Sequence, residues 1–166
     1  KAPFRLNKEF TLTDLCSQIQ RLSALSKTFS INLKVRKLGN FIALMMDPNE
    51  QKMQNLASNL VENLDYFRAP LHQEEIDKRR MSNLTTREDK NLLNWGYPYV
   101  FNDFRFHITL TEKIQYGSDR ESMVRAASSH FSGSLENTIK VSSISLFVQE
   151  SSEADFLQIQ QFALEE

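Results

Sequence analysis

The stretch from Asp103 to Thr111 alternates strictly between apolar and polar side chains. Its apolar residues are Phe104, Phe106, Ile108 and Leu110, and its polar residues are Arg105, His107, Thr109 and Thr111. An alternation with a period of two predicts a β-strand with one buried and one exposed face. We therefore expect a strand of an antiparallel sheet here, with its apolar side chains under helices and its polar side chains on an open face.

The rest of the chain shows the patterns of alternating helices and strands. Apolar residues spaced three and four apart predict amphipathic helices over residues 11–27, from 47–49 to 67, and over 118–132. Shorter helices are expected over 73–80 and from Thr85 to Gly96. Strands are expected over 1–6, 29–36, 41–46, 138–148 and 156–164, with a tight turn at Gly39-Asn40. The strand over 41–46 is apolar on both faces, which indicates a central position.

Residues 1–46 and 104–164 repeat one order of predicted elements, with a strand and a long helix followed by further strands. The repeat predicts one domain over 1–166, built from a lobe 1–67 with connecting helices over 68–100 and a lobe 101–166. An approximate twofold axis would relate the two lobes. If the strand over 1–6 corresponds to the one over 104–111, the counterpart of His107 lies before Lys1. Because the chain starts at Lys1 without a methionine, we expect that its true beginning is missing.

Composition narrows the class of protein. With 20 basic and 21 acidic residues among 166, the net charge is −1, so no overall field attracts nucleic acid or a membrane surface. The single cysteine excludes an internal disulfide framework and fits a cytoplasmic protein. No apolar run approaches the roughly 20 residues that span a bilayer. We expect a soluble globular protein that has no membrane partner.

The polar side chains of the stretch 103–111 form the candidate site. Arg105, His107 and Thr109 can donate several hydrogen bonds to an anion, and an imidazole titrates near neutral pH. A short His-x-Thr pattern also arises by chance on any strand surface that faces solvent. The surrounding sequence therefore has to decide between an active site and an ordinary exposed strand.

Four segments together resemble a known family. They are Lys1-Ala-Pro-Phe-Arg-Leu6, Phe67-Arg-Ala-Pro-Leu71, Trp95-Gly-Tyr-Pro-Tyr-Val100 and Phe104-Arg-Phe-His-Ile-Thr-Leu-Thr111. The resemblance is to an uncharacterised bacterial family associated with phosphonate-utilisation operons, within the 2H phosphoesterase (LigT-like) superfamily. It covers essentially the whole chain. In that family a first motif of His-Ala-Thr-Leu type directly precedes the segment that begins at Lys1, and this sequence lacks that motif.

The resemblance implies a bilobal α+β fold in which each lobe contributes one His-x-Thr/Ser strand to a cleft. Two histidines would divide base and acid roles in hydrolysing a cyclic phosphodiester, with neither a metal nor another cofactor. His107 would be one of them, and Thr109 would donate its hydroxyl to a phosphate oxygen. Further binding to this phosphate, or to a second one, is expected from Arg105, Thr111, Lys1 and Arg5, with Tyr97 and Tyr99 at the rim. The expected partner is a small cyclic or ribose phosphate.

Two other functions stay open from the sequence. A module of the same fold could bind a phosphate ligand or RNA without chemistry, which the missing first motif favours for this chain. Alternatively, the domain could be structural, with His107 a hydrogen-bonded strand residue. A histidine buried among apolar side chains would exclude the active site, so the placement of His107 is decisive.

Overall fold

A computed structural model describes residues 2–46, 50–151 and 153–166 of the chain. Its contacts divide the chain into two compact units. Unit 1 comprises Lys1–Thr28, Asn55–Phe104 and Ser142–Glu166, and unit 2 comprises Phe29–Gln54 and Arg105–Val141. Helices and antiparallel sheets occur in both units, which confirms the α+β class. Each unit joins segments that are distant in sequence, so this division differs from the contiguous lobes expected over 1–67 and 101–166.

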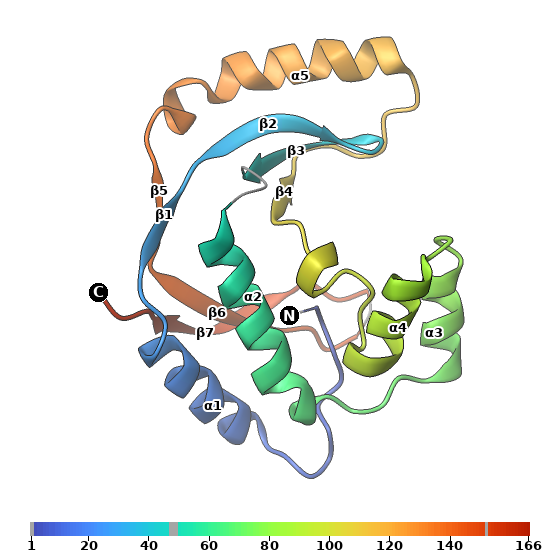
Figure 1. Cartoon of the computed structure of the whole chain (residues 1–166), viewed down its shortest axis with the longest axis vertical. Coiled ribbons are helices and arrows are strands. Elements are labelled where there is room, and N and C mark those ends of the chain that lie inside the picture. The colour runs from blue at the N-terminus through green and yellow to red at the C-terminus, as the bar shows by residue number, and fades with distance from the viewer. Residues whose placement is uncertain (1, 47–49, 152) are drawn as a thin grey trace. The chain divides into compact units, whose positions relative to one another are not determined.

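Unit 2 is built around an antiparallel three-stranded sheet with the order β2, β3, β4 (Figure 1). These strands are β2 (Leu33–Leu38), β3 (Phe41–Met46) and β4 (His107–Thr109). Gly39, at a φ of +59°, forms the turn between β2 and β3, because a positive φ suits a residue without a side chain. The central place of β3 explains why Ile42, Ala43 and Leu44 are buried. The expected hairpin and central strand are confirmed.

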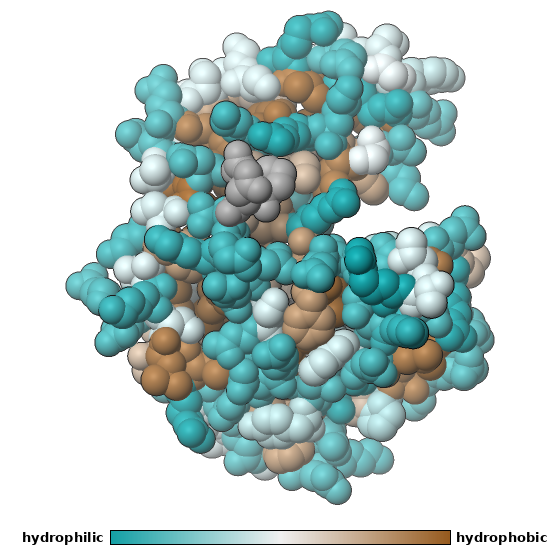
Figure 2. Space-filling view, viewed as in Figure 1, coloured by the Kyte–Doolittle hydropathy of each residue, from teal (hydrophilic) through white to brown (hydrophobic). Residues whose placement is uncertain are grey.

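Helix α5 (Gly117–Phe131) covers one face of this sheet, against β2 and β3. Lys37 of β2 forms an ion pair with Glu121 of α5, which identifies the covered face. Figure 2 shows mainly hydrophilic and neutral residues over the outward side of α5. The helix begins at Gly117 without a side-chain cap, one residue before the start expected from the sequence. A short 3-10 turn, η3 (Gly133–Leu135), follows it.

Two predicted strands are each divided in two, because they change partner along their length. Residues 29–36 form β1 (Phe29–Ile31) and the start of β2, and residues 138–148 form β5 (Ile139–Val141) and β6 (Ser143–Val148). β1 pairs with β5, with Phe29 opposite Val141, whereas β2 pairs with β3, and β6 pairs with β7 (Leu157–Ala163). The change of partner falls between Val141 and Ser143, and β6 has a register irregularity between Leu146 and Phe147.

Unit 1 packs α1 (Leu12–Ala24) against the antiparallel pair β6 and β7 (Leu157–Ala163). The Thr11 hydroxyl and the Asp14 carboxylate cap the helix reciprocally. The hydrophobic core cluster of unit 1 consists of the buried residues Leu15, Ile19, Leu22, Leu64, Phe67 and Phe162. The helix and the C-terminal strand were both predicted at nearly these positions.

The remaining helices connect these parts of the chain. They are α2 (Gln51–Leu64), η1 (Asp65–Phe67), α3 (Gln73–Arg80), α4 (Thr86–Trp95) and η2 (Phe101–Asp103). α4 ends at Gly96 with a φ of +76°, as predicted, and an added Cβ there would lie 2.6 Å from Cδ of Arg68. The start of α2 expected at residues 47–49 lies outside the described residues.

Two strand predictions were too long. The stretch 104–111 contains only β4, because the 3-10 turn η2 precedes it and the Phe104 N–H bonds the Phe101 carbonyl at 2.9 Å. Ile108 was expected under a helix but is 46% exposed, since β4 is an edge strand and α5 covers β2 and β3. The strand over 1–6 is reduced, among its described residues, to one bridge between Leu6 and Arg68.

Candidate functional site

The pairing of the three strands in unit 2 places four polar side chains on one face of the sheet. Lys34 lies opposite Met45, which lies opposite His107, and Arg36 lies opposite Ala43, which lies opposite Thr109. Directly opposite residues project to the same face of a sheet. We call the side chains of Lys34, Arg36, His107 and Thr109 the polar face. The ion-paired Lys37 has the opposite parity on β2, so the polar face is the one that α5 leaves open.

His107 is held in one tautomer by a backbone carbonyl that lies just before β4. Its Nδ1 lies 2.8 Å from the carbonyl oxygen of Arg105, and the side chain is exposed. Because a carbonyl oxygen can only accept, this hydrogen bond requires a proton on Nδ1. In the neutral ring Nε2 therefore carries the lone pair and can accept a proton, and in the charged ring it can donate one. A His107 buried among apolar side chains would have excluded an active site, and the exposed position of the ring avoids that exclusion.

Thr109 lies two residues further along the same strand. Its side chain is exposed, and its hydroxyl makes no hydrogen bond within the described part of the chain. Two residues of a strand advance by about 6.7 Å, so the hydroxyl and the imidazole can contact one small ligand. The Leu110 N–H bonds the carbonyl of Ile42 at 2.8 Å, which ties the end of β4 to the central strand.

Lys34 and Arg36 are the members of the polar face that sequence reasoning missed. Both are exposed, and neither makes an ion pair or a side-chain hydrogen bond with any residue that the structure describes. Their alternation with Leu33 and Val35 was visible in the sequence. Placing them beside His107 would have required the further step of pairing β4 with the far edge of the central strand β3.

The other two candidates on the stretch 103–111 differ from each other. Arg105 is exposed, precedes β4 and supplies the carbonyl that fixes the His107 ring. Thr111 is committed internally, since its hydroxyl donates to the Glu112 carbonyl at 2.9 Å and accepts from the Ile42 N–H at 3.1 Å. Thr111 therefore terminates β4, and its proton is already in use.

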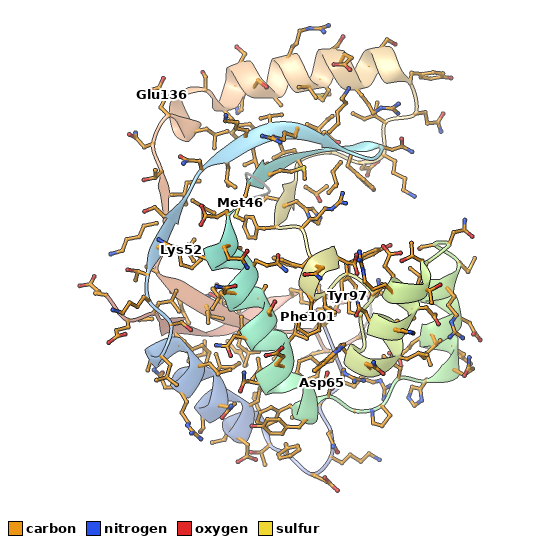
Figure 3. All side chains as sticks on the ribbon, viewed as in Figure 1. Met46, Lys52, Asp65, Tyr97, Phe101 and Glu136 are labelled. Carbon is orange, nitrogen blue, oxygen red and sulfur yellow. The ribbon has the colours of Figure 1, made fainter. Side chains whose placement is uncertain are left out.

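The candidate residues in unit 1, Arg5, Tyr97 and Tyr99, already contact other side chains of that unit. Arg5 Nη2 donates to Glu75 Oε2 at 2.7 Å and to the Pro70 carbonyl at 2.8 Å. The ring of Tyr97, labelled in Figure 3, has the guanidinium carbon of Arg79 5.0 Å from its centroid. Tyr97 also makes an edge contact with Tyr99, with ring centroids 5.6 Å apart. Lys1 lies outside the described residues.

The pKa of the Glu75 carboxyl lies below the ordinary glutamate value. The largest cause is the hydrogen bond that it accepts from the backbone N–H of His72, at 2.6 Å, and the second is the bond from Arg5. Both bonds favour the charged form of the carboxyl. Arg5 thus binds the first turn of α3 through Glu75, and a phosphate ligand would have to compete with Glu75 for the Arg5 guanidinium.

A hollow of about 610 Å³ adjoins the polar face along β2. Five consecutive residues, Asn32 to Arg36, line it together with Ser128, Ser132, Leu135 and Glu136, all within unit 2 (Figure 3 labels Glu136). Because this lining includes Ser128 of α5 and residues from both faces of β2, the hollow lies along the edge of β2 beside α5. His107 and Thr109 do not line it, so it is not part of the polar face.

The described residues contain neither a metal-binding cluster nor a helix that could span a membrane. Nowhere among them do three His, Cys, Asp or Glu side chains meet as a metal site would require. None of the described helices combines the length and apolarity needed to cross a membrane.

Comparisons with known proteins place this geometry in context. The profile of a family described as "Protein of unknown function (DUF1045)" matches residues 1–157. A "Ribose 1,5-bisphosphate phosphokinase PhnN" of Janthinobacterium sp. (strain Marseille) is 34% identical over 139 residues, which is 81% of this chain and 30% of that protein. A protein of the same name from Laribacter hongkongensis (strain HLHK9) is 29% identical over 156 residues, 94% of this chain and 36% of that protein. The chain spans about a third of the length of these relatives.

Proposed function

Because the chain belongs to the DUF1045 family, whose description assigns no reaction, we propose from its polar face that it is a phosphoesterase hydrolysing a cyclic phosphodiester on a small ribose phosphate. The resemblance to a bacterial family associated with phosphonate-utilisation operons, within the 2H phosphoesterase superfamily, agrees with this proposal. The single observation that carries it is the bond from His107 Nδ1 to the Arg105 carbonyl, which directs a competent Nε2 to an exposed face.

The proposed reaction is an attack of water on phosphorus. A bond forms from the water oxygen to phosphorus, the bond from phosphorus to one ribose oxygen breaks, and a phosphate monoester results. One group takes a proton from water and another delivers a proton to the leaving oxygen. His107 performs one of these transfers through Nε2, and Thr109 donates its hydroxyl to a phosphoryl oxygen. The other transfer falls to the second histidine that the resemblance implies.

The names of the relatives support the class of substrate. Ribose 1,5-bisphosphate, which appears in those names, is a phosphorylated ribose. The phosphokinase activity in the same names belongs to proteins of which this chain spans about a third, so we do not propose it for the chain. The names of the relatives therefore support only a ribose phosphate as the ligand.

A binding module without chemistry is the second candidate. The observation that favours it is the pair of exposed cations Lys34 and Arg36, which have no partner among the residues that the structure describes and suit a phosphate whether or not it reacts. RNA is the weaker ligand for such a module, because a net charge of −1 provides no general attraction to a polyanion.

Phosphorus NMR separates the two candidates. The full-length protein, with any residues N-terminal to Lys1, is incubated with ribose cyclic phosphates in the presence of a chelator. Conversion of the cyclic signal to that of a monoester is the expected result, at a rate that the chelator does not change. Saturable binding of the cyclic phosphates without conversion would replace the phosphoesterase by the binding module.

A further inference from the structure

The polar face carries more positive charge than a cyclic phosphodiester can neutralise. Lys34 and Arg36 are unpartnered among the described residues, and the His107 ring adds a further charge whenever it is protonated. The other positions of this face on β2, β3 and β4 are Leu38, Phe41, Ala43 and Met45. None of these positions is acidic, whereas a cyclic phosphodiester carries a single negative charge. The face therefore matches a ligand with at least one additional negative group.

The two cations also lie too far from His107 and Thr109 to bind the same phosphate with ease. β3 separates them, and strands lie about 4.8 Å apart, so the Cα atoms of Lys34 and His107 are roughly 10 Å apart. Ala43, which lies between Arg36 and Thr109, is fully buried and contributes no polar group to that row. The polar face thus offers two anion positions, one on β4 and one on β2.

We propose that the substrate carries a second phosphate, as a monoester, and that Lys34 and Arg36 bind it while the cyclic phosphodiester lies at His107 and Thr109. This inference rests on the proposed phosphoesterase function and specifies its substrate. A monoester carries a charge of about −1.5 to −2 at pH 7, which two cations balance. Arg36 can bind two of its oxygens at once, and Lys34 adds a point charge.

A different role for these cations has to be excluded by the test. β2 is an edge strand, and charged side chains on edge strands prevent unwanted pairing with other chains. That role would make Lys34 and Arg36 matter for solubility, with no dependence on the substrate. A binding role would make them matter only for a ligand with the second phosphate.

The test compares two substrates that differ only in the second phosphate. They are a nucleoside 2′,3′-cyclic phosphate with a free 5′-hydroxyl and the same compound with a 5′-phosphate. For the wild-type protein we expect kcat/KM to be about 10-fold to 100-fold higher for the doubly phosphorylated compound, as charge-assisted hydrogen bonds contribute. The preference should decrease below about pH 6, where the monoester takes up its second proton.

The variants Lys34→Gln and Arg36→Gln should each reduce that ratio by about 10-fold, mainly through KM, and the double variant should bring it close to one. Lys37→Gln is the matched control, since Lys37 is on the same strand but faces α5, and it should leave the ratio unchanged. Thermal unfolding of each variant checks that it is folded.

Equal kcat/KM for the two compounds in the wild-type protein would overturn the second-phosphate site while leaving the phosphoesterase intact. A ratio that survives the double variant would overturn the assignment to Lys34 and Arg36. Hydrolysis of neither compound would count against the proposed function itself, and the substrate inference would fall with it.

Discussion

The Nδ1 atom of His107 lies 2.8 Å from the carbonyl oxygen of Arg105, two residues earlier in the chain and just before β4. The contact is local in sequence, because only Phe106 separates the two residues. It leaves Nε2 as the atom that faces a ligand, beside the hydroxyl of Thr109. The proposed chemistry therefore depends on β4 being held at the edge of its sheet.

Thr109 should contribute less to catalysis than His107, because it supplies one hydrogen bond and transfers no proton. We expect Thr109→Ala to lower kcat/KM for a cyclic phosphodiester by about 10-fold, the loss of one hydrogen bond to a charged group. Thr109→Ser keeps the hydroxyl and should retain most of the activity. Steady-state kinetics of the two variants give the comparison, and an equal loss in both would show that the methyl group matters instead.

Arg120 should stabilise the segment that follows β4. Its Nη1 donates to the Ile114 carbonyl at 2.7 Å, and to Asn40 Oδ1 in the β2–β3 turn at 3.2 Å. It also donates to the Gln115 carbonyl at 3.0 Å. Arg120→Ala removes the donor from all three acceptors and should lower the free energy of unfolding by about 1–3 kcal/mol. Arg125→Ala, on the same helix, removes only a bond to Ser122 and should cost less than about 0.5 kcal/mol. Urea unfolding would contradict this if the two variants were equally stable.

Gly96 and Gly39 form a matched pair for testing backbone strain against close packing. Both have a positive φ, so Gly39→Ala should cost about 1 kcal/mol through strain alone. At Gly96 the new Cβ would lie 2.6 Å from Arg68 Cδ, whereas nothing lies within 4 Å at Gly39. Gly96→Ala must also displace a guanidinium bonded to Asp65, and should cost about 2–4 kcal/mol. Similar losses from both in thermal unfolding would show that Arg68 moves freely.

Glu75 should make stability depend on acid pH. Because its pKa is lowered in the folded state, the stabilisation is complete above the ordinary glutamate value of about 4.3 and is lost as the pH falls through the folded-state pKa. Glu75→Gln should remove about 0.5 kcal/mol at pH 7, as expected for an exposed cap, and nothing in strong acid. Arg5→Gln should keep most of the effect, since the His72 bond is its larger cause. Unfolding free energies from pH 7 to pH 2.5 give the test.

Local sequence patterns predicted the positions of helices and strands better than they predicted which strands pair with each other. Leu15, Ile19 and Leu22 identified α1, and Gly96 identified the end of α4, because helix stripes and caps are set within a few residues. Alternation also predicted a long strand over 104–111, yet only 107–109 pair with β3. Alternating side chains show how a segment would face a core, while the length of a strand depends on the partner it meets.

The candidate site shows the same limit. His107 and Thr109 were found from one strand, where both lie on the same face. Lys34 and Arg36 come from a strand about 70 residues earlier, and only the order β2, β3, β4 brings them onto that face. A charge alternating with leucine and valine says which face of a strand is polar, but not which other strand shares that face.

The central claim is that His107 transfers a proton in the hydrolysis of a cyclic phosphodiester. The decisive measurement is kcat of the full-length His107→Ala protein, with His130→Ala as control. His130 is an exposed histidine of α5 whose ring contacts Phe131. We predict that His107→Ala lowers kcat by about 10²-fold to 10⁴-fold with little change in KM, and that His130→Ala has no effect. A folded His107→Ala protein with the kcat of the wild type would contradict the account.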